Sequence, residues 1–321
     1  LYFVLMFLLL LTTSSYTSQW LSPKHISWVI YGIIFFTGVV RAYSGPSFNA
    51  FLAQLVPSQQ LVRAASINSM AWLIAAVTGP AVAGLLLGFT NITISFSIVC
   101  GMILLGYLVF RQIQPKPVSF NPGNNRTWES VKVGLKFVLH KKALLGAMSL
   151  DMFAVLFGGA TALLPVFAKD ILHVGPMGLG WLIAATYLGN FIAIAWLTYK
   201  PLKRKQGTLL HYMVGGFGFS ILVFALSNNY ILSFAALFVS GLFDGVSMII
   251  RGTIMQIFVP DEMRGRVSSV NSIFINSSNE LGQFESGVTA DLMGTVPSVV
   301  FGGCMTLLVS IITWVKATEL R

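Results

Sequence analysis

Apolar stretches long enough to cross a bilayer recur along the whole of this 321-residue chain, and few charges interrupt them. Only 9% of the residues are Asp, Glu, Lys or Arg, whereas a soluble globular domain carries about 25%. Hydrophobic residues make up 55% of the chain. A fold in water could not cover its surface with so few charges, so we expect the chain to be surrounded by lipid.

In lipid every backbone polar group needs an internal partner, so spanning segments are helices or closed barrels. Barrel strands alternate polar and apolar residues, but here the apolar runs are continuous, as in residues 234–242. We therefore predict an all-α integral membrane protein. Ten spanning helices are expected, over residues 1–17, 26–52, 64–88, 93–110, 143–168, 181–199, 208–227, 231–258, 270–292 and 298–315.

The basic residues orient these helices. Sixteen of the 20 Lys and Arg residues fall in alternate gaps or in the C-terminal tail, two fall in the other gaps (Lys24 and Lys169), and Arg41 and Arg251 lie inside expected spans. The positive-inside rule places the sixteen, and both ends of the chain, in the cytoplasm. The net charge of +10 is thus a topology signal. We expect no nucleic-acid partner, because no basic face lies on a soluble domain.

The chain contains an internal repeat. Residues 38–84 align without a gap on residues 241–287, at an offset of 203, with ten of 47 positions identical, against about three expected from average composition. Polar residues are among the matches, so chance similarity of two apolar hairpins is the weaker explanation. The identities include Gly38 with Gly241, Val56-Pro57 with Val259-Pro260, Arg63 with Arg266, Asn68 with Asn271, and Gly79 with Gly282.

The repeat predicts the domain organisation. Helices 143–168 and 181–199 have repeat equivalents that would precede residue 1, so we expect two further helices there and twelve in all, in two parallel six-helix repeats. Leu1, inside an apolar run, is interpreted as a truncation point. The expected domains are residues 1–110 with four helices, a cytoplasmic linker 111–142 with a short amphipathic helix, and a six-helix half 143–321.

Three motifs carry a family resemblance. Residues 151–165 read DMFAVLFGGATALLP, residues 260–266 read PDEMRGR, and residues 278–287 read SNELGQFESG. Together with the parallel repeat, they resemble the enterobactin-exporter-like, multidrug-efflux branch of the major facilitator superfamily, over essentially the whole chain. The resemblance implies a monomeric inner-membrane transporter without cofactor or metal, which exports siderophores, drugs or related metabolites in exchange for protons.

Ionisable residues inside spans are costly, by about 2.5–3.5 kcal/mol each on insertion scales, and mark functional sites. Asp244 and Arg251 are seven residues apart, so they share one helix face. Arg41 occupies the repeat position of Asp244, and we predict a charge pair between these two across the central cavity. The alternative is that each charge pairs within its own half and stabilises packing.

Further candidates come from the second half. Asp151 is expected to be an isolated buried carboxylate, which can bind a proton or a cation near neutral pH, or else a hydrogen-bonded packing residue. Glu280 and Glu285 are about 140° apart on their helix, so one faces the cavity, for which we choose Glu280, and the other faces a neighbouring helix. Asn190 is a weaker polar candidate at mid-span.

Two motifs suggest roles in gating. Gly79-Pro80 resembles in part the antiporter Gly-Pro motif, although the doubled glycine after Pro80 is replaced by Ala83-Gly84. Asp261, Arg264 and Arg266 mix charges at a cytoplasmic turn, where they form either a gate latch or a positive-inside anchor.

Two other function classes remain as alternatives. A lipid or lysolipid flippase could use the same scaffold. A membrane-embedded enzyme would need a clustered nucleophile or metal site, but the four histidines are scattered and fit no zinc-binding pattern.

Overall fold

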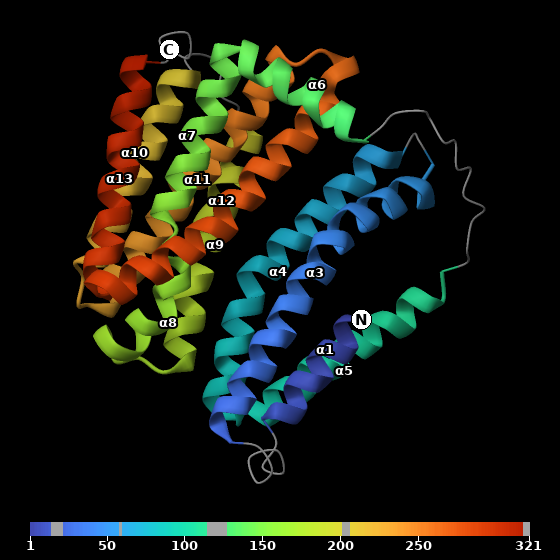
Figure 1. The fold of residues 1–321 in the computed structure, drawn as a ribbon, viewed down its shortest axis with the longest axis vertical. Helices are drawn as coiled ribbons and strands as arrows, with labels where there is room; N and C mark the ends of the chain where they lie inside the picture. Colours follow the sequence, from blue (N-terminus) through green and yellow to red (C-terminus); the bar gives the residue numbers. More distant parts are fainter. Residues whose placement is uncertain (14–21, 58–59, 114–126, 201–205, 317–321) are drawn as a thin grey trace. The chain divides into compact units, whose positions relative to one another are not determined.

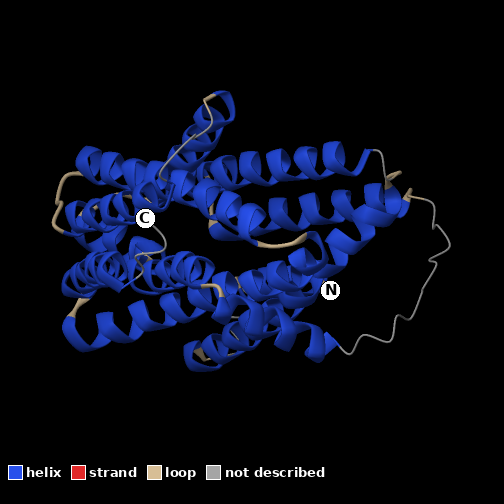
Figure 2. Ribbon diagram, turned by 90° about the horizontal axis from the view of Figure 1, so that it is seen from above, coloured by secondary structure: helices blue, strands red, loops and turns tan. Residues whose placement is uncertain are grey.

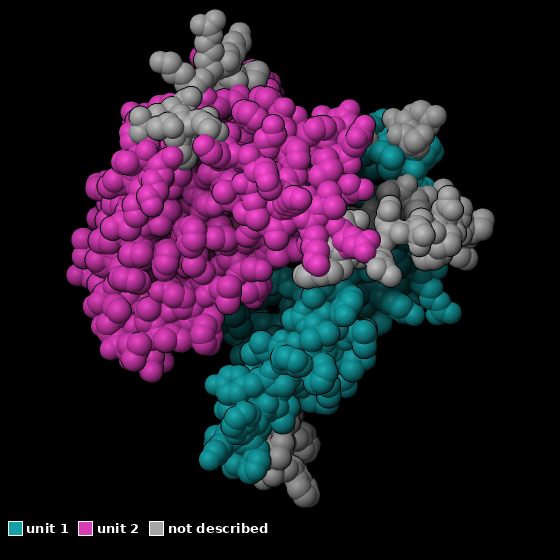
Figure 3. Space-filling model, turned by 45° about the horizontal axis from the view of Figure 1, so that its top comes forward, with its two compact units in different colours: residues 1–75, 82–121 teal, residues 76–81, 122–321 magenta. Residues whose placement is uncertain are grey.

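A computed structural model describes residues 1–321 except 14–21, 58–59, 114–126, 201–205 and 317–321. The described chain is built from helices joined by short loops (Figure 2). It divides into two compact units, which we call the first unit (residues 1–75 and 82–121) and the second unit (residues 76–81 and 122–321) (Figure 3). Each of the ten expected spans contains a helix, which confirms the all-α prediction.

The described residues of the first unit form four helices in chain order, although residues 76–81 of the third are grouped with the second unit (Figure 1). The short α1 packs on α3 and α5. Pro23 begins α3 at a position where its missing N–H is not needed, and the Asn91 side chain caps α5 by accepting a hydrogen bond from the Ile94 N–H. The bounds are α1 Tyr2–Thr12, α3 Pro23–Leu55, α4 Leu61–Phe89 and α5 Ile92–Arg111.

Apart from residues 76–81 of α4, the described part of the second unit begins with the expected amphipathic helix, α6 (Thr127–His140). Val138 on one side of α6 is fully buried, whereas Lys132 and Lys136 on the other side are exposed. The helix packs on α12 and α7. The remaining helices at expected spans are α7 Lys142–Gly158, α9 Pro176–Tyr199, α10 Gln206–Ala225, α11 Tyr230–Phe258, α12 Arg264–Met293 and α13 Thr295–Lys316.

The expected span 143–168 is not one regular helix. It ends as α7 at Gly158 and continues as a 3-10 helix (Ala160–Leu163), the short α8 (Leu164–Val166) and a π-helix (Phe167–Ile171). Glycine favours a break in a helix, and Pro165 lacks the N–H that a continuous helix would use. These two residue types explain why the regular hydrogen bonding stops at Gly159.

Eight helices are long and apolar enough to cross a membrane, among the described residues. They include α3, α5 and α11, and the interrupted segment Lys142–Ile171. Of the ten expected spans, α1 is the short one, with 11 described residues, and α12 is the polar one. The polar character of α12 follows from its five charged residues: Arg264, Arg266, Glu280, Glu285 and Asp291.

The second unit has two apolar clusters, one toward each end of its helices. Along α11, Ala236 and Leu237 belong to one cluster, and Ile250 and Ile254 belong to the other. Asp244 lies between them. A polar side chain at this position is far from bulk water at either end of the helix, so it needs partners from neighbouring helices.

Glycines bring α9 and α11 together at the same level. A Cβ added at Gly245 would lie 2.8 Å from the Asn190 carbonyl oxygen, and one added at Gly241 would collide with the backbone of Thr186. Small residues allow helix backbones in membranes to approach closely. Gly241 and Gly245 therefore place the side chains of Asn190 and Asp244 within reach of each other.

Candidate functional site

Four of the predicted residues from three helices form one polar cluster in the second unit. Arg251 of α11 makes an ion pair with Asp151 of α7 through Nη1 and Oδ2. A second guanidinium nitrogen, Nη2, lies 3.7 Å from Oδ1 of Asp244. Asn190 of α9 donates a hydrogen bond from Nδ2 to Oδ2 of Asp244, at 3.0 Å. We call Asp151, Asn190, Asp244 and Arg251 the polar cluster.

The helix geometry explains how α11 contributes two members of the cluster. Asp244 and Arg251 are seven residues apart and lie on one face, as their spacing predicts. The Arg251 side chain is further held by a hydrogen bond from Nε to the Ser247 carbonyl oxygen, at 3.3 Å. This bond and the ion pair fix the guanidinium between the two carboxylates.

Asp151 is buried, with 6% of its surface exposed. The expectation that it is isolated is wrong, because Arg251 pairs with it. The sequence alone suggested isolation because Asp151 has only apolar neighbours along its own helix, and its partner is 100 positions later in the chain. A limited contact between α7 and α11 brings the two together.

Asp244 has its described partners within its own unit, namely Arg251 and Asn190. Arg41 lies on α3 in the first unit, so the predicted Arg41–Asp244 pair stays a prediction. Asn190, the weaker candidate of the sequence analysis, turns out to be a direct neighbour of Asp244. Its Oδ1 atom is buried and has no hydrogen-bond partner among the described residues.

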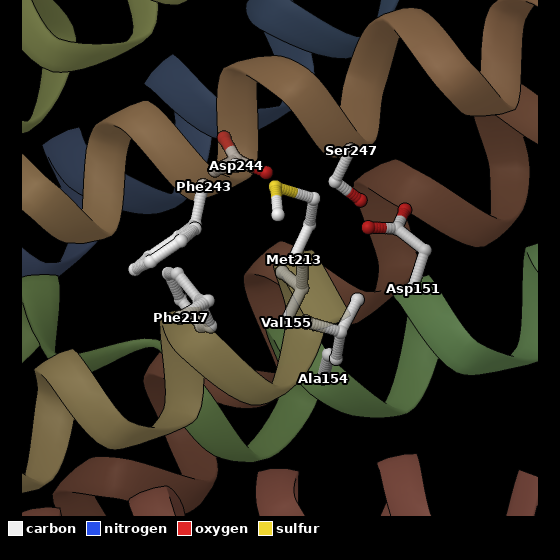
Figure 4. A pocket seen from close by; sticks show the side chains of 9 residues that line it. Asp151, Ala154, Val155, Met213, Phe217, Phe243, Asp244 and Ser247 are labelled. Atoms are coloured by element: carbon white, nitrogen blue, oxygen red, sulfur yellow. The ribbon is translucent and has the colours of Figure 1, made fainter. Parts of the chain in front are cut away.

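A small cavity adjoins the polar cluster (Figure 4). Its volume is about 10 Å³, which is about the space needed for one water molecule. Asp151, Asp244 and Ser247 supply its polar wall, and the apolar wall is formed by Ala154, Val155, Met213, Val214, Phe217 and Phe243.

Ser247 is a residue of this site that the sequence analysis missed. It is 3% exposed, lines the cavity and lies on α11 between Asp244 and Arg251. Its spacing of three and four residues from these charges places it on their face. Ser247 is also identical to Ser44 at the repeat offset. Both signals could have identified it.

The α12 candidates lie outside the polar cluster. Glu280 is exposed and Glu285 is half-buried, so their assignment to the cavity and to a neighbouring helix stays a prediction. Gly282 and Ser286 lie against α7: a Cβ at Gly282 would be 2.7 Å from the Leu156 carbonyl, and the Ser286 hydroxyl donates to the Gly159 carbonyl at 3.4 Å. At Gly287, one turn further along α12, no described atom lies within 4 Å of a Cβ position.

The two gating motifs are placed as follows. Gly79 and Pro80 lie inside α4, and a Cβ at Gly79 would meet no described atom within 4 Å. Arg264 pairs with Asp261 at 2.8 Å, with both side chains largely exposed. Arg266 donates to the Met263 sulfur at 3.6 Å. The Asp261–Arg264 pair spans a single turn, so this bond itself joins no two helices.

Comparisons with known proteins give a consistent assignment. A family model described as Major Facilitator Superfamily matches residues 1–283. The enterobactin exporter EntS of Escherichia coli O1:K1 / APEC is 23% identical over 303 residues, covering 94% of this chain and 72% of the exporter. The EntS protein of Shigella dysenteriae serotype 1 (strain Sd197) gives the same values.

A solved structure shares the fold. It is a bacterial homologue of the human lysosomal transporter Spinster, in an inward-facing and unoccupied conformation. The TM-score is 0.59 at 14% identity, and the match covers 99% of this chain and 81% of that protein.

Proposed function

Because this chain belongs to the Major Facilitator Superfamily, we propose that it is a secondary active exporter that works by alternating access and exchanges small molecules for protons. Family membership and the transporter relatives make it a multi-pass membrane transport protein rather than an enzyme. Proton coupling, direction and substrate class are the proposed part. We further propose that the protein acts as a monomer in the cytoplasmic membrane with both ends of this chain in the cytoplasm.

The observation behind proton coupling is the charge balance of the polar cluster. Two carboxylates, Asp151 and Asp244, face a single guanidinium, Arg251. One negative charge is therefore left over at a site between two apolar clusters. Uncompensated charge inside a membrane span is costly, and the uptake of one proton removes it.

Asn190 suits both protonation states of Asp244. In the structure its Nδ2 donates to the carboxylate. A protonated carboxyl group becomes a donor, and the buried Oδ1 of Asn190, without a partner among the described residues, is then available as an acceptor if the amide turns over. Asn190 could thus stabilise Asp244 before and after protonation.

Export of a siderophore or drug is proposed from the likeness to the enterobactin exporters. The repeat supports Arg41 as a second partner for Asp244, reached when the two halves rock, because the two residues occupy equivalent repeat positions. Glu280 and Glu285 are proposed as further groups on the transport path, and Asp261, Arg264 and Arg266, with Gly79-Pro80, as parts of the gating elements.

Transport into inside-out vesicles tests this function. Enterobactin and the fluorescent cation ethidium serve as separate probes, under an imposed proton gradient, with and without an uncoupler. We expect accumulation of one probe that stops when the uncoupler is added, and the Asp244→Asn variant should lose this dependence. Accumulation that is insensitive to the uncoupler would rule out proton antiport and leave a transporter driven in another way.

A further inference from the structure

Ser247 is the polar group of the cavity that the proposed function does not yet use. It lies three residues after Asp244 and four before Arg251 on α11. In Figure 4 its hydroxyl points toward the carboxylate of Asp151, which comes from α7. A serine hydroxyl both donates and accepts hydrogen bonds. It can therefore connect two carboxyl groups whichever of them is protonated.

The cavity has the size and polarity of a water site. Its volume of about 10 Å³ suits one water molecule, which ordinarily needs two to four polar partners. Asp151, Asp244 and Ser247 provide three such partners. Met213, Phe217 and Phe243 supply apolar parts of the wall (Figure 4), so a water held here meets solvent only past side chains of this lining.

The charged groups around the cavity are few. From α7 the facing group is Asp151, and α11 itself contributes Asp244 and Arg251. From α9 the facing group is Asn190, which is uncharged. From α10 the wall is apolar, and the buried His211 of that helix instead contacts Trp314 of α13. The described surroundings thus contain two carboxylates and one guanidinium.

We propose that the Ser247 hydroxyl and one water molecule in this cavity link Asp151 to Asp244, so that the two carboxylates share a single proton. The proton leaves one carboxyl oxygen for the water or hydroxyl oxygen, which passes its own proton to the other carboxylate. No bond other than O–H bonds changes, and the total charge stays constant. Arg251 pairs with whichever carboxylate is ionised; in this structure it is paired with Asp151, and its Nη2 lies 3.7 Å from Oδ1 of Asp244.

This inference rests on the proposed proton coupling and assigns a separate role to each residue. Ser247 is a positioning residue, because it acts through the two carboxylates. The arrangement allows the proton to enter at Asp244, whose side chain is 35% exposed, and to reach Asp151, whose side chain is 9% exposed, without the carboxylates touching each other. Arg251 then changes partner, which couples the proton position to the contact between α7 and α11.

Infrared difference spectroscopy on the purified full chain in lipid vesicles tests the link without a transport substrate. The carboxylic acid C=O band is followed through a pH titration in the wild type and in Asp151→Asn, Asp244→Asn, Ser247→Ala and Ser240→Ala. Ser240 is the matched control: it is on the same helix, 1% exposed, and its hydroxyl bonds to the Leu237 carbonyl at 2.7 Å.

We expect one titrating acid band from the polar cluster in the wild type, in addition to the bands of the eight other Asp and Glu side chains. Each Asp→Asn variant should lose this band, because the remaining carboxylate and Arg251 balance each other. Ser247→Ala should shift the band, and Ser240→Ala should leave it in place. If Ser247→Ala does not fold, Ser247→Cys replaces it, since it keeps the volume but has a weaker donor, and the same shift is expected.

A cluster band that persists in either Asp→Asn variant would overturn the shared proton, and a cluster band that is identical in wild type and Ser247→Ala would overturn the link through Ser247. Failure of the broader proposal has a different signature. If proton-dependent transport persists while the band is unchanged by Ser247→Ala, only the link through Ser247 is wrong. If wild-type transport ignores the uncoupler, the proposed proton coupling itself is wrong.

Discussion

Helices α3 and α11 are equivalent in the sequence repeat but differ in what surrounds them. In the most apolar 18-residue segment of α3 only 6% of the residues are buried, compared with 44% of the residues in the corresponding segment of α11. At the matching glycines, Gly38 has no described atom within 4 Å of a Cβ position, whereas Gly241 lies against the Thr186 backbone of α9. The repeat therefore predicts a helix and its small residues at both places, but neighbouring helices decide burial.

The same comparison applies to charge. Arg41 of α3 stands where α11 has Asp244, and the α3 position that matches Arg251 is Phe48, which is 46% exposed. Ser44 and Ser247 are identical at this offset. The polar cluster is thus a feature of the second unit, built on a helix pattern that both units share.

The largest expected difference between the two helices concerns their arginines. Arg251→Gln should lower the free energy of unfolding by about 3–5 kcal/mol, because removal of one partner of a buried ion pair leaves the other charge uncompensated. Arg41→Gln should have a clearly smaller effect. The measurement is the midpoint of thermal unfolding in detergent, followed by the intrinsic fluorescence of the protein.

The added substitution Asp151→Asn should restore part of the stability of Arg251→Gln, because it removes one of the two stranded carboxylates. Equal losses of stability for the Arg41 and Arg251 variants would contradict the assignment of the charged cluster to the second unit alone.

The matching glycines give an intermediate effect. Gly241→Ala should destabilise the protein by about 1–3 kcal/mol, because the new methyl group overpacks the contact between α9 and α11. Gly38→Ala should stabilise it by about 0.5–1 kcal/mol, since alanine is favoured over glycine inside a helix. Thermal unfolding of both variants, with transport assays on the same preparations, measures the contrast. A destabilised Gly38→Ala would mean that this face of α3 is packed.

The smallest expected effect is the coupling between the two repeat-related charges. The charge swap Arg41→Asp with Asp244→Arg should transport roughly fivefold faster than the product of the two single losses predicts, a coupling of about 1 kcal/mol. The rescue should be partial, because Arg251 stays beside position 244. Combining Arg63→Asp with Asp244→Arg is the control and should give no rescue. If the losses of transport rate in the Arg41 swap are strictly additive, Arg41 does not interact with Asp244 during transport.

Much of the fold could be predicted from local sequence. A helix in each of the ten expected spans, the amphipathic helix α6 and the family follow from apolar runs, basic residues and short motifs, all of which are properties of neighbouring residues. The apolar pattern does not reveal the break in the span 143–168, because Gly158, Gly159 and Pro165 lie within one long apolar run. Their lost hydrogen bonding outweighed the apolar pattern there.

The site was only partly predictable. Polar residues are rare inside spans, and this rarity points to each of Asp151, Asn190, Asp244 and Arg251. The periodicity of a single helix predicts that Asp244 and Arg251 share a face. Ser247 was missed because serines are common in helices, although its spacing from Asp244 and Arg251 and its identity with Ser44 at the repeat offset distinguish it. Glu280 and Glu285 are also ionisable residues inside an expected span, yet they lie outside the polar cluster.

The sequence by itself determined that this chain is a helical membrane protein with a duplicated pattern, because these properties follow from hydropathy and from residue identity at a fixed offset. Only the tertiary structure decided that Asp151 pairs with Arg251 and that Asn190 holds Asp244. The partners are 100 and 54 positions apart, and helix periodicity carries no information on which helices pack together. Close contacts at Gly241 and Gly245, where α9 meets α11, bring Asn190 to Asp244, and the contact of α7 with α11 adds Asp151 to the site.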